Sequence, residues 1–457
     1  MTQGATPRED AERIWLAAIR AADPVHLLAA LPDGALGLPA RGRVIVVGGG
    51  KAAAGMAGAV AARLAAAGVP PAAVSGLVSV PEGCGARVPG IEIRETRPAG
   101  VNLPTAAVVE ATEAMLGLVA SASAADLVVA LVTGGGSALL AAPASGVGLG
   151  EKVAVSRFLS AAGAGIEALN TVRRAASRVK AGGLARACRA GRMAVLVLSD
   201  VIGDPLDLIA SGPCMPAPAD PRAALAVLAR FGATGAGVAP RLVALLGRAA
   251  ASPPPARPAD TGPEWTTPAG CRVAHRIVGS NATAVDAGAA AAVASGYEVE
   301  RRHADPGSSE SVADAGATGR RLAAEARALA ARARATGRPR ALVEGGEATV
   351  RVPADHGRGG RNQQTVLAAL EACATGGWPE RTVIASIGTD GEDGPTDAAG
   401  AWADARVAGI VHADRPALDR ALARCDALPL LGAAGGIVRT GPTGTNVADV
   451  RIILARP

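Results

Sequence analysis

The sequence predicts a two-domain α/β protein, with an N-terminal doubly wound (Rossmann-like) parallel sheet and a C-terminal α/β domain. Short apolar runs alternate with alanine-rich stretches long enough for crossover helices, as in parallel sheets covered on both faces. Nearly every apolar run ends in glycine or an acid. A chain of 457 residues also exceeds one ordinary hydrophobic core, so two domains are expected.

The first domain begins with an amphipathic helix over about residues 8–22. Its predicted strands, which are β-rich and continuously apolar, are Val44–Val47, Gly76–Val80, Leu127–Val132 and Ala194–Leu198. The periodic pattern breaks at the proline-rich segment 251–263. We therefore predict domains at residues 1–255 and 265–457.

A second α/β pattern follows this segment. The predicted strands of the second domain are Val273–Val278, Glu298–Arg302, Ala341–Val343, Ala348–Val352, Val383–Ile387 and Arg451–Leu454. A long helix rich in alanine and arginine is expected over about residues 310–336. Its arginines indicate a solvated helix face, not a binding site.

Composition argues against several classes of protein. The net charge of +6 would permit nucleic-acid binding, but the arginines are scattered and aromatic residues make up only 2%. The six cysteines form no C-x-x-C pair, which favours reduced thiols. The first ten residues lack an apolar leader, and no stretch is long enough to span a bilayer. We expect a cytoplasmic protein that binds neither nucleic acid nor membranes.

Lysine is rare, and its positions are informative. The chain has three lysines against 43 arginines. Lys51 follows Gly48–Gly50, and Lys180 precedes Ala-Gly-Gly, whereas Lys152 has an ordinary helical context. A lysine retained in an arginine-rich chain indicates a need for a compact point charge. Next to a glycine loop, the usual partner of such a charge is phosphate.

Five loops at predicted strand ends carry the residues of a phosphoryl-transfer site, because ligands of open α/β sheets bind at the carboxyl ends of strands. The loops are Gly48–Lys51, Thr133–Ser137, Leu198–Asp204 with Ala210–Pro213, Val343–Glu347 with Gly357–Asn362, and Ser386–Asp397. Their chemistry combines glycine-rich anion cradles, a lysine, an Arg-Asn pair and carboxylates.

The residues of these loops divide into three groups. The expected substrate- and nucleotide-binding residues are Gly49, Gly50, Gly134, Gly135, Gly136, Ser137, Lys180, Ser211, Gly212, Glu344, Glu347 and Asn362. Lys51 and Arg361 are expected to contact the transferred phosphate or the substrate's oxyanion. Asp200, with Asp204, Asp390 and Asp393 in support, is expected to bind Mg²⁺ or to accept the hydroxyl proton.

Two common nucleotide-binding motifs fit poorly. A Walker A motif fails because Ile45 stands in place of its first glycine and Ala52 follows Lys51. A dinucleotide fingerprint matches loosely at Gly48, Gly50 and Ala53, but no acid stands about twenty residues further on to bind a ribose. None of the five histidines forms a credible triad or zinc site.

Together the motifs resemble the glycerate 2-kinases whose C-terminal domain is called MOFRL, a family earlier assigned as hydroxypyruvate reductases. The resemblance spans almost the whole chain. The segments that carry it are Gly48–Ala53, Thr133–Leu140, Leu169–Arg174, Ser177–Lys180, Leu198–Val201, Ala210–Pro213, Gly359–Gln363, Gly388–Gly391, Asp393–Asp397 and Thr440–Asn446.

The resemblance implies transfer of phosphate from ATP, with Mg²⁺, to the 2-hydroxyl of D-glycerate to give 2-phosphoglycerate, in a cleft between the two domains. The family's important lysine and arginine correspond to Lys51 and Arg361. Asn170, Arg173 and Asn446 join the expected binding residues through their motifs. A monomer or homodimer is expected.

Three segments depart from the family pattern: Thr96-Arg97-Pro98 replaces Gly-His-Pro, Thr133 replaces the serine that usually precedes Gly-Gly-Gly, and Cys425–Leu431 replaces a stretch richer in aromatic residues. These departures leave open another small 2-hydroxy acid as acceptor. Two alternatives also stay open. One is an NAD(P)H-dependent hydroxypyruvate or tartronate reductase. The other is a non-catalytic anion-binding module.

Overall fold

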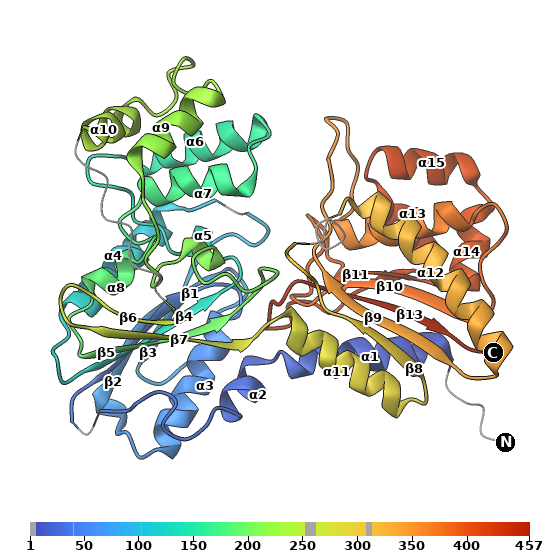
Figure 1. The fold of residues 1–457 in the computed structure, drawn as a ribbon, viewed down its shortest axis with the longest axis horizontal. Coiled ribbons are helices and arrows are strands. Elements are labelled where there is room, and N and C mark those ends of the chain that lie inside the picture. Colours follow the sequence, from blue (N-terminus) through green and yellow to red (C-terminus); the bar gives the residue numbers. More distant parts are fainter. Residues whose placement is uncertain (1–5, 40, 102, 252–261, 308–312) are drawn as a thin grey trace. The chain divides into compact units, whose positions relative to one another are not determined.

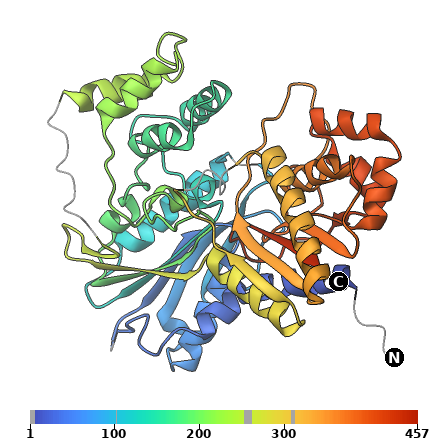
Figure 2. The same ribbon diagram turned by 45° about the vertical axis from the view of Figure 1, so that its right-hand side comes forward.

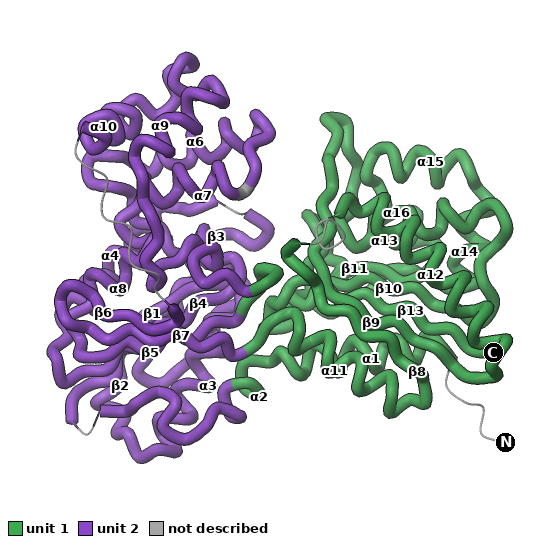
Figure 3. The backbone as a smooth tube through the Cα atoms, in the orientation of Figure 1, with its two compact units in different colours: residues 1–27, 199–203, 279–457 green, residues 28–198, 204–278 purple. Residues whose placement is uncertain are grey.

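The computed structural model describes residues 6–39, 41–101, 103–251, 262–307 and 313–457. The described residues form two compact units (Figure 3). The N-unit contains residues 28–198 and 204–278, and the C-unit contains residues 1–27, 199–203 and 279–457. Most of the predicted boundary segment, residues 252–261, lies outside the described residues, so that boundary stays a prediction.

The sheet of the N-unit is doubly wound, as predicted. Its strands, in spatial order, are β3 (Ile91–Arg97), β2 (Val74–Pro81), β1 (Val44–Gly49), β4 (Leu127–Thr133), β5 (Arg192–Leu198), β7 (Arg272–Gly279) and β6 (Glu264–Thr266). The pairs from β3 to β5 are parallel, and β6 pairs with β7 antiparallel. Every residue of β1 and β4 is buried, which explains their unbroken apolar sequences.

Helices cover this sheet and form a second layer above it (Figure 1). The helices against the strands are α3 (Ala53–Ala66), α4 (Ala106–Ala120), α5 (Gly136–Leu139) and α8 (Gly183–Ala187), and the 3₁₀ turns are η1 (Pro71–Ala73) and η2 (Ile209–Ser211). The added layer consists of α6 (Leu149–Ala161), α7 (Ile166–Ala175), α9 (Pro221–Arg230) and α10 (Pro240–Ala250). This layer has its own hydrophobic core, which includes Leu159, Leu228 and Leu242.

The sheet of the C-unit is mixed. Its spatial order is β12 (Ile437–Val438), β11 (Gly400–Ala403), β10 (Thr382–Gly388), β13 (Asp449–Ala455), β9 (Arg340–Gly346) and β8 (Glu298–Arg302). Only the β8–β9 pair of this sheet is parallel among the described strands.

Helices cover both faces of the C-unit sheet (Figures 1 and 2). The pair α1 (Pro7–Ala21) and α11 (Asn281–Ala294) packs on one face, and the pair α12 (Ala315–Thr336) and α13 (Arg361–Cys373) packs on the other. The short helices α14 (Ala405–His412), α15 (Arg415–Ala423) and α16 (Ala427–Ala434) pack around α13, and α2 (Pro24–Ala29) follows α1 in the chain.

A buried carboxylate fixes α1 to the C-unit. Asp10 is fully buried and accepts hydrogen bonds from the Tyr297 hydroxyl at 2.7 Å and from the Arg456 guanidinium at 2.5 Å. A carboxylate buried without such partners would be costly. The N-terminal helix therefore packs with the C-terminal part of the chain, although sequence order placed it in the first domain.

Several predicted elements differ in the structure. The strand predicted at residues 273–278 exists as β7 but belongs to the sheet of the N-unit. The strand predicted at residues 348–352 is wrong, because Val352 is 56% exposed and only Thr349 makes a bridge, to Asp314. Strands β3, β6, β11 and β12 were not predicted from the sequence.

The expectation of reduced thiols agrees with the structure. All six cysteines are free thiols. None of the helices in the described part of the chain is long and apolar enough to cross a membrane.

Candidate active site

The first group of predicted residues lies where the strand order of the N-unit reverses. Strands β1 and β4 are parallel neighbours, and the chain continues from β1 to β2 on one side and from β4 to β5 on the other. Loops that follow two such strands diverge and leave a crevice at the carboxyl ends. The loop with Lys51 and the loop with Gly134 meet here, and the Lys51 amide donates to the Gly134 carbonyl at 2.9 Å.

Glycine is required in both loops, at Gly50 by close approach and at Gly135 by a left-handed backbone conformation. Gly50 has a φ of +142°, and a Cβ there would lie 2.3 Å from Thr133 Cγ2. Gly135 has a φ of +76°, and a Cβ there would lie 3.5 Å from Lys51 Cγ and 4.0 Å from Arg97 Nη2. The loop of Gly134–Gly136 is therefore flanked by two cationic side chains.

A third cation lies further along the same loop. The ammonium of Lys180 donates to the Ser137 hydroxyl at 2.9 Å, to the Ser137 carbonyl at 3.0 Å and to the Ala210 carbonyl at 3.2 Å. The Ser137 hydroxyl lies 3.1 Å from the Ser211 hydroxyl, which donates to Asn170 Oδ1 at 3.2 Å. The structure thus brings Lys180, Ser137, Ser211 and Asn170 together in one hydrogen-bonded group.

The C-unit contains a second group of predicted residues, centred on Arg361 at the start of α13. Its guanidinium donates two hydrogen bonds to Asp449, from Nε at 2.7 Å and from Nη2 at 2.8 Å. Nη1 donates to Glu347 at 2.9 Å. The side chain of Asp449 is fully buried, so this bidentate pair fixes the plane of the guanidinium.

The charge of Glu347 is strongly affected by its surroundings. Loss of solvent around the carboxylate raises the pKa of Glu347 to about 7, and the positive charge of Arg361 opposes this rise. The carboxylates of Asp449, Asp200 and Asp390 raise the pKa further. Solvent reaches 42% of the Glu347 side chain, which screens part of this rise but leaves its direction unchanged.

Asp393 has a structural role in this group. One of its oxygens accepts from the Asn362 amide at 2.9 Å, and the other accepts from the Gln363 amide at 2.9 Å and from Gln363 Nε2 at 3.0 Å. These are free amides of the first turn of α13. Asp393 is only 1% exposed. Its carboxylate therefore caps the helix that carries Arg361.

Asn362 and Glu344 are also held by neighbours. Asn362 donates to Asp449 Oδ1 at 3.1 Å and accepts from Ser386 at 2.6 Å. Glu344 binds the Arg321 guanidinium at 2.5 and 2.9 Å and Arg451 at 3.2 Å. Although burial opposes it, these two arginines lower the pKa of Glu344. Both predicted binding residues thus stabilise the sheet around Arg361.

The remaining predicted carboxylates lie in different places. Asp200 belongs to the C-unit, where Asn446 Nδ2 donates to it at 3.2 Å. Asp390 belongs to the same unit, whereas Asp204 belongs to the N-unit and has a φ of +55°. No group of three or more His, Cys, Asp or Glu side chains in the described ranges has an arrangement that would hold a metal ion by itself.

The segment of Cys425–Leu431, which departs from the resembled family, supports the loop before Arg361. The Arg358 amide donates to Asp426 at 2.7 Å, and the Leu428 amide donates to the Arg358 carbonyl at 2.9 Å. The Cys425–Leu431 segment therefore packs against the loop that precedes Arg361. Arg97 of the Thr96-Arg97-Pro98 departure lies beside Lys51.

Two contributors were missed from the sequence. Asp449 lay two residues before the predicted strand Arg451–Leu454, whereas the observed strand β13 begins at Asp449. Arg97 was noted as a departure but not as a neighbour of Lys51.

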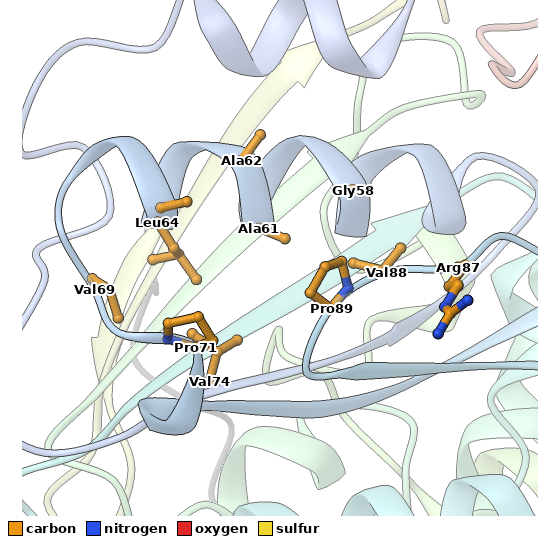
Figure 4. Close-up of a pocket in the computed structure, with 11 residues that line it drawn as sticks. Gly58, Ala61, Ala62, Leu64, Val69, Pro71, Val74, Arg87, Val88 and Pro89 are labelled. Carbon is orange, nitrogen blue, oxygen red and sulfur yellow. The ribbon is translucent and has the colours of Figure 1, made fainter.

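An apolar cavity in the N-unit is not part of this site. It has a volume of about 430 Å³ and lies between α3 and residues 69–89, with Leu64, Val74 and Val88 in its wall (Figure 4). Arg87 is its only charged lining residue among those described. Such a wall offers little to bind a phosphate.

Comparison with known proteins gives matches along nearly the whole chain. Residues 10–246 match a domain of unknown function named DUF4147, and residues 340–449 match the MOFRL family. Glycerate kinase from Homo sapiens is 33% identical over 98% of this chain and 93% of its own. D-glycerate 2-kinase from Thermotoga maritima is 33% identical over 78% of each chain. An Agrobacterium vitis protein with the provisional name hydroxypyruvate reductase is 36% identical over 98% of this chain and 94% of its own.

A solved structure agrees with these relatives. The crystal structure of glycerate kinase from Thermotoga maritima has a TM-score of 0.77 and 32% identity, over 98% of this chain and 99% of that chain. Fold and loops together define a two-unit α/β enzyme of the kinase class. The chain belongs to the glycerate kinase family with the MOFRL domain.

The raised pKa of Glu347 predicts how stability depends on pH. Between pH 4.5 and about 7, the folded protein holds a proton on Glu347 that the unfolded chain has lost, so this group costs stability as the pH rises through that range. Glu347→Gln removes this cost. The melting temperature of Glu347→Gln, relative to wild type, is expected to increase from about pH 5 to about pH 8 in thermal melts.

Glu344→Gln is the matched control for this experiment. The lowered pKa of Glu344 means that its stabilisation is complete above its ordinary value of 4.5 and is lost only as the pH falls below it. Glu344→Gln should therefore lower the melting temperature equally at both pH values. A relative melting temperature of Glu347→Gln that stayed constant or fell would contradict the prediction.

Proposed function

We propose that this protein transfers the γ-phosphoryl group of ATP to the 2-hydroxyl of D-glycerate, giving 2-phosphoglycerate. The observation that carries the proposal is the agreement in fold and sequence with glycerate kinase along almost the whole chain. The lysine and glycine loops at the strand reversal of the N-unit add chemical support. Backbone amides beside a fixed cation are a common way to bind phosphate.

Lys51 is proposed to pair with oxygens of the transferred phosphate. It follows Gly49 and Gly50, and its loop is bonded to that of Gly134. Glycine lets the backbone approach the phosphate, and the ammonium supplies a charge as negative charge builds up on the oxygens. The Ser137 hydroxyl and Gly135 and Gly136 amides belong to the same cradle.

Arg361 is proposed to bind the substrate's carboxylate or the transferred phosphate. Two of its N–H groups are held by Asp449 and one by Glu347, so its plane is fixed before substrate binds. A preorganised guanidinium loses little freedom on binding an oxyanion. In this proposal, Asp393 and Asn362 are positioning residues, because they hold the first turn of α13.

The carboxylates of the C-unit fit Mg²⁺. Asp200 and Asp390 lie close enough to Glu347 to raise its pKa, which indicates an excess of negative charge that a divalent cation would relieve. Mg²⁺ in phosphoryl transfer is usually held by one or two carboxylates together with substrate phosphates, and it neutralises charge on the phosphate oxygens. We assign this role to Asp200 and Asp390. Asp204 is retained as a second candidate, and Asp393 is left out because amides occupy both of its oxygens.

A coupled assay tests the function. Purified protein with Mg²⁺ should release ADP from ATP only when D-glycerate is added, and the product should be 2-phosphoglycerate and not the 3-phosphate. A parallel reaction with NADH or NADPH and hydroxypyruvate or tartronate semialdehyde tests the reductase alternative. Oxidation of the nicotinamide without ADP release would overturn the proposal, and inactivity in both reactions would favour the anion-binding module.

Lys51 variants test the point-charge role. Lys51→Ala should lower kcat by about 100-fold or more, the usual effect of losing one preorganised contact to developing charge. Lys51→Arg should recover little of this loss, because a planar fork does not replace a compact ammonium. The exposed Arg189 offers a control, and Arg189→Ala should leave kcat unchanged. Turnover near wild type in Lys51→Arg would exclude the special role of lysine.

Titration with Mg²⁺ tests the metal ligands. Asp200→Asn and Asp390→Asn should each raise the Mg²⁺ concentration for half-maximal activity by about tenfold or more. Asp397→Asn is a control in the loop of Asp390, because Asp397 is exposed and pairs with Arg439. Lost kcat at saturating Mg²⁺ would instead assign the residue as the base that accepts the hydroxyl proton. No change in either quantity would remove it from the site.

A further inference from the structure

Lys152 differs from an ordinary helical lysine in its burial. It lies in the first turns of α6 and is only 4% exposed. Within the described part of the chain, its ammonium nitrogen is buried and has no hydrogen-bond partner. A buried ammonium without an acceptor is costly, and proteins normally pair such a group or neutralise it. This lysine therefore lacks the partner that its charge requires.

The groups around Lys152 are also cationic. Its charge acts on Lys180, which is 2% exposed, and so do the charges of Arg173 and Arg174 on α7. Burial, with the neighbouring charge of Arg173, lowers the pKa of Lys152 to about 7. Burial and the same three neighbours lower the pKa of Lys180 well below its ordinary value. Lys152 and Lys180 are thus buried among like charges in a poorly solvated region.

Little negative charge balances this cluster. Arg174 is paired with Asp207 at 2.9 Å. Lys180 donates only to neutral oxygens, those of Ser137 and Ala210. No carboxylate contacts Lys152 among the described residues. Since the cost of grouping like charges is recovered when an anion binds, the cluster is suited to receive one.

The backbone around the cluster is built to hold this arrangement. The residues Ala210, Ser211 and Gly212 have φ values of +51°, +63° and +62°, a conformation that non-glycine residues rarely adopt. Ser211 bonds to Asn170 on α7, and helix α6 packs on α7. Figure 1 shows α6 and α7 next to one another in the layer above the sheet. Three segments far apart in sequence thus present cations and hydroxyls to one place.

We propose that Lys152, with Arg173 and Lys180, forms a buried pocket for a small oxyanion of a substrate. The shared chemistry is a carboxylate or phosphate group, and the glycerate carboxylate is the ligand expected. Lys51 and its glycine loops already offer a phosphate cradle, so the Lys152 cluster is assigned to the carboxylate. Arg361 then has the second of the two roles proposed for it, binding the transferred phosphate. This assignment rests on the proposed function, and it adds Lys152 to the substrate-binding residues.

Binding without turnover tests the pocket. Wild-type protein is titrated separately with D-glycerate, inorganic phosphate and ATP, in the absence of a second substrate, by calorimetry and by thermal shift. Lys152→Met fills the same space without the charge. It should bind the pocket's ligand about 10- to 100-fold more weakly, the effect of one lost hydrogen bond to a charged group. Without ligand, its melting temperature should equal or exceed that of wild type, because an unpaired buried charge is removed.

Arg157→Met is the matched control. Arg157 lies one turn further along α6, is exposed, and has the same charge. It should bind all three ligands as wild type does, whereas a general electrostatic attraction would weaken both variants equally and would overturn the pocket. Arg173→Gln is a second pocket variant and should also weaken binding. It keeps the test valid if Lys152→Met does not fold.

The outcomes separate the two proposals. Weaker glycerate binding alone assigns the pocket to the carboxylate, and weaker binding of phosphate and ATP alone assigns it to a phosphate. If Lys152→Met and Arg173→Gln bind every ligand like wild type while the enzyme phosphorylates glycerate, the pocket is wrong and the proposed function stands. If wild type binds the oxyanion through Lys152 but phosphorylates nothing, the function is wrong and the pocket stands.

Discussion

The reversal of strand order between β1 and β4 is the constraint on which the N-unit site depends. Strands β1 and β4 are parallel neighbours, but the chain leaves β1 toward β2 and leaves β4 toward β5, in opposite directions. The loops after β1 and β4 therefore meet at the end of the sheet, where no crossover of the described chain covers them. The meeting is close, since the Lys51 amide lies 2.9 Å from the Gly134 carbonyl. A side chain at Gly50 would collide with Thr133. Glycine in these loops is therefore a condition of the fold, and open amides beside a cation are its chemical result.

The two units carry opposite excesses of charge. In the N-unit, Lys152, Arg173 and Lys180 gather with little balancing carboxylate, and burial lowers the pKa of each. In the C-unit, carboxylates gather around Arg361, and the pKa of Glu347 is raised. A kinase must bind anionic substrates and a divalent cation. Each unit thus has the charge that suits one of these ligands, and each is less stable without it.

The sequence predicted elements whose pattern reflects burial on both faces. Strands β1, β4, β5 and β10 are buried along nearly their whole length and largely apolar, and they were predicted at nearly their observed positions. The edge strand β3 is mostly polar, with only Ile91 and Ile93 apolar, and gave no such signal. Residues 348–352 have a strand-like composition, but no sheet edge receives them. Placement of β7 in the first sheet depends on tertiary pairing, which local sequence does not encode.

The same distinction applies to the candidate site. The motif loops around Lys51, Ser137 and Arg361 were predicted because glycine and charge recur at strand ends. Asp449 and Lys152 were not, because their roles arise from neighbours that are distant in sequence. Asp449 pairs with Arg361 because the fold places the start of β13 beside the start of α13. Lys152 is buried only because α7 and its neighbours cover α6, and a helix sequence alone does not show what packs on it.

Two of the departures from the family pattern lie in different surroundings, one at the loop before Arg361 and one near Lys51. The segment of Cys425–Leu431 contacts the loop before Arg361 through Asp426 and Leu428, so it acts only through the position of that loop. Arg97 is 1% exposed and lies beside Gly135 and Lys51. The Gly-His-Pro pattern of the resembled family has histidine here, which loses its charge near neutral pH, whereas a guanidinium keeps it. In the phosphate cradle proposed around Lys51, Arg97 is therefore a permanent additional charge, and it bears more directly than Cys425–Leu431 on which anion that cradle would hold.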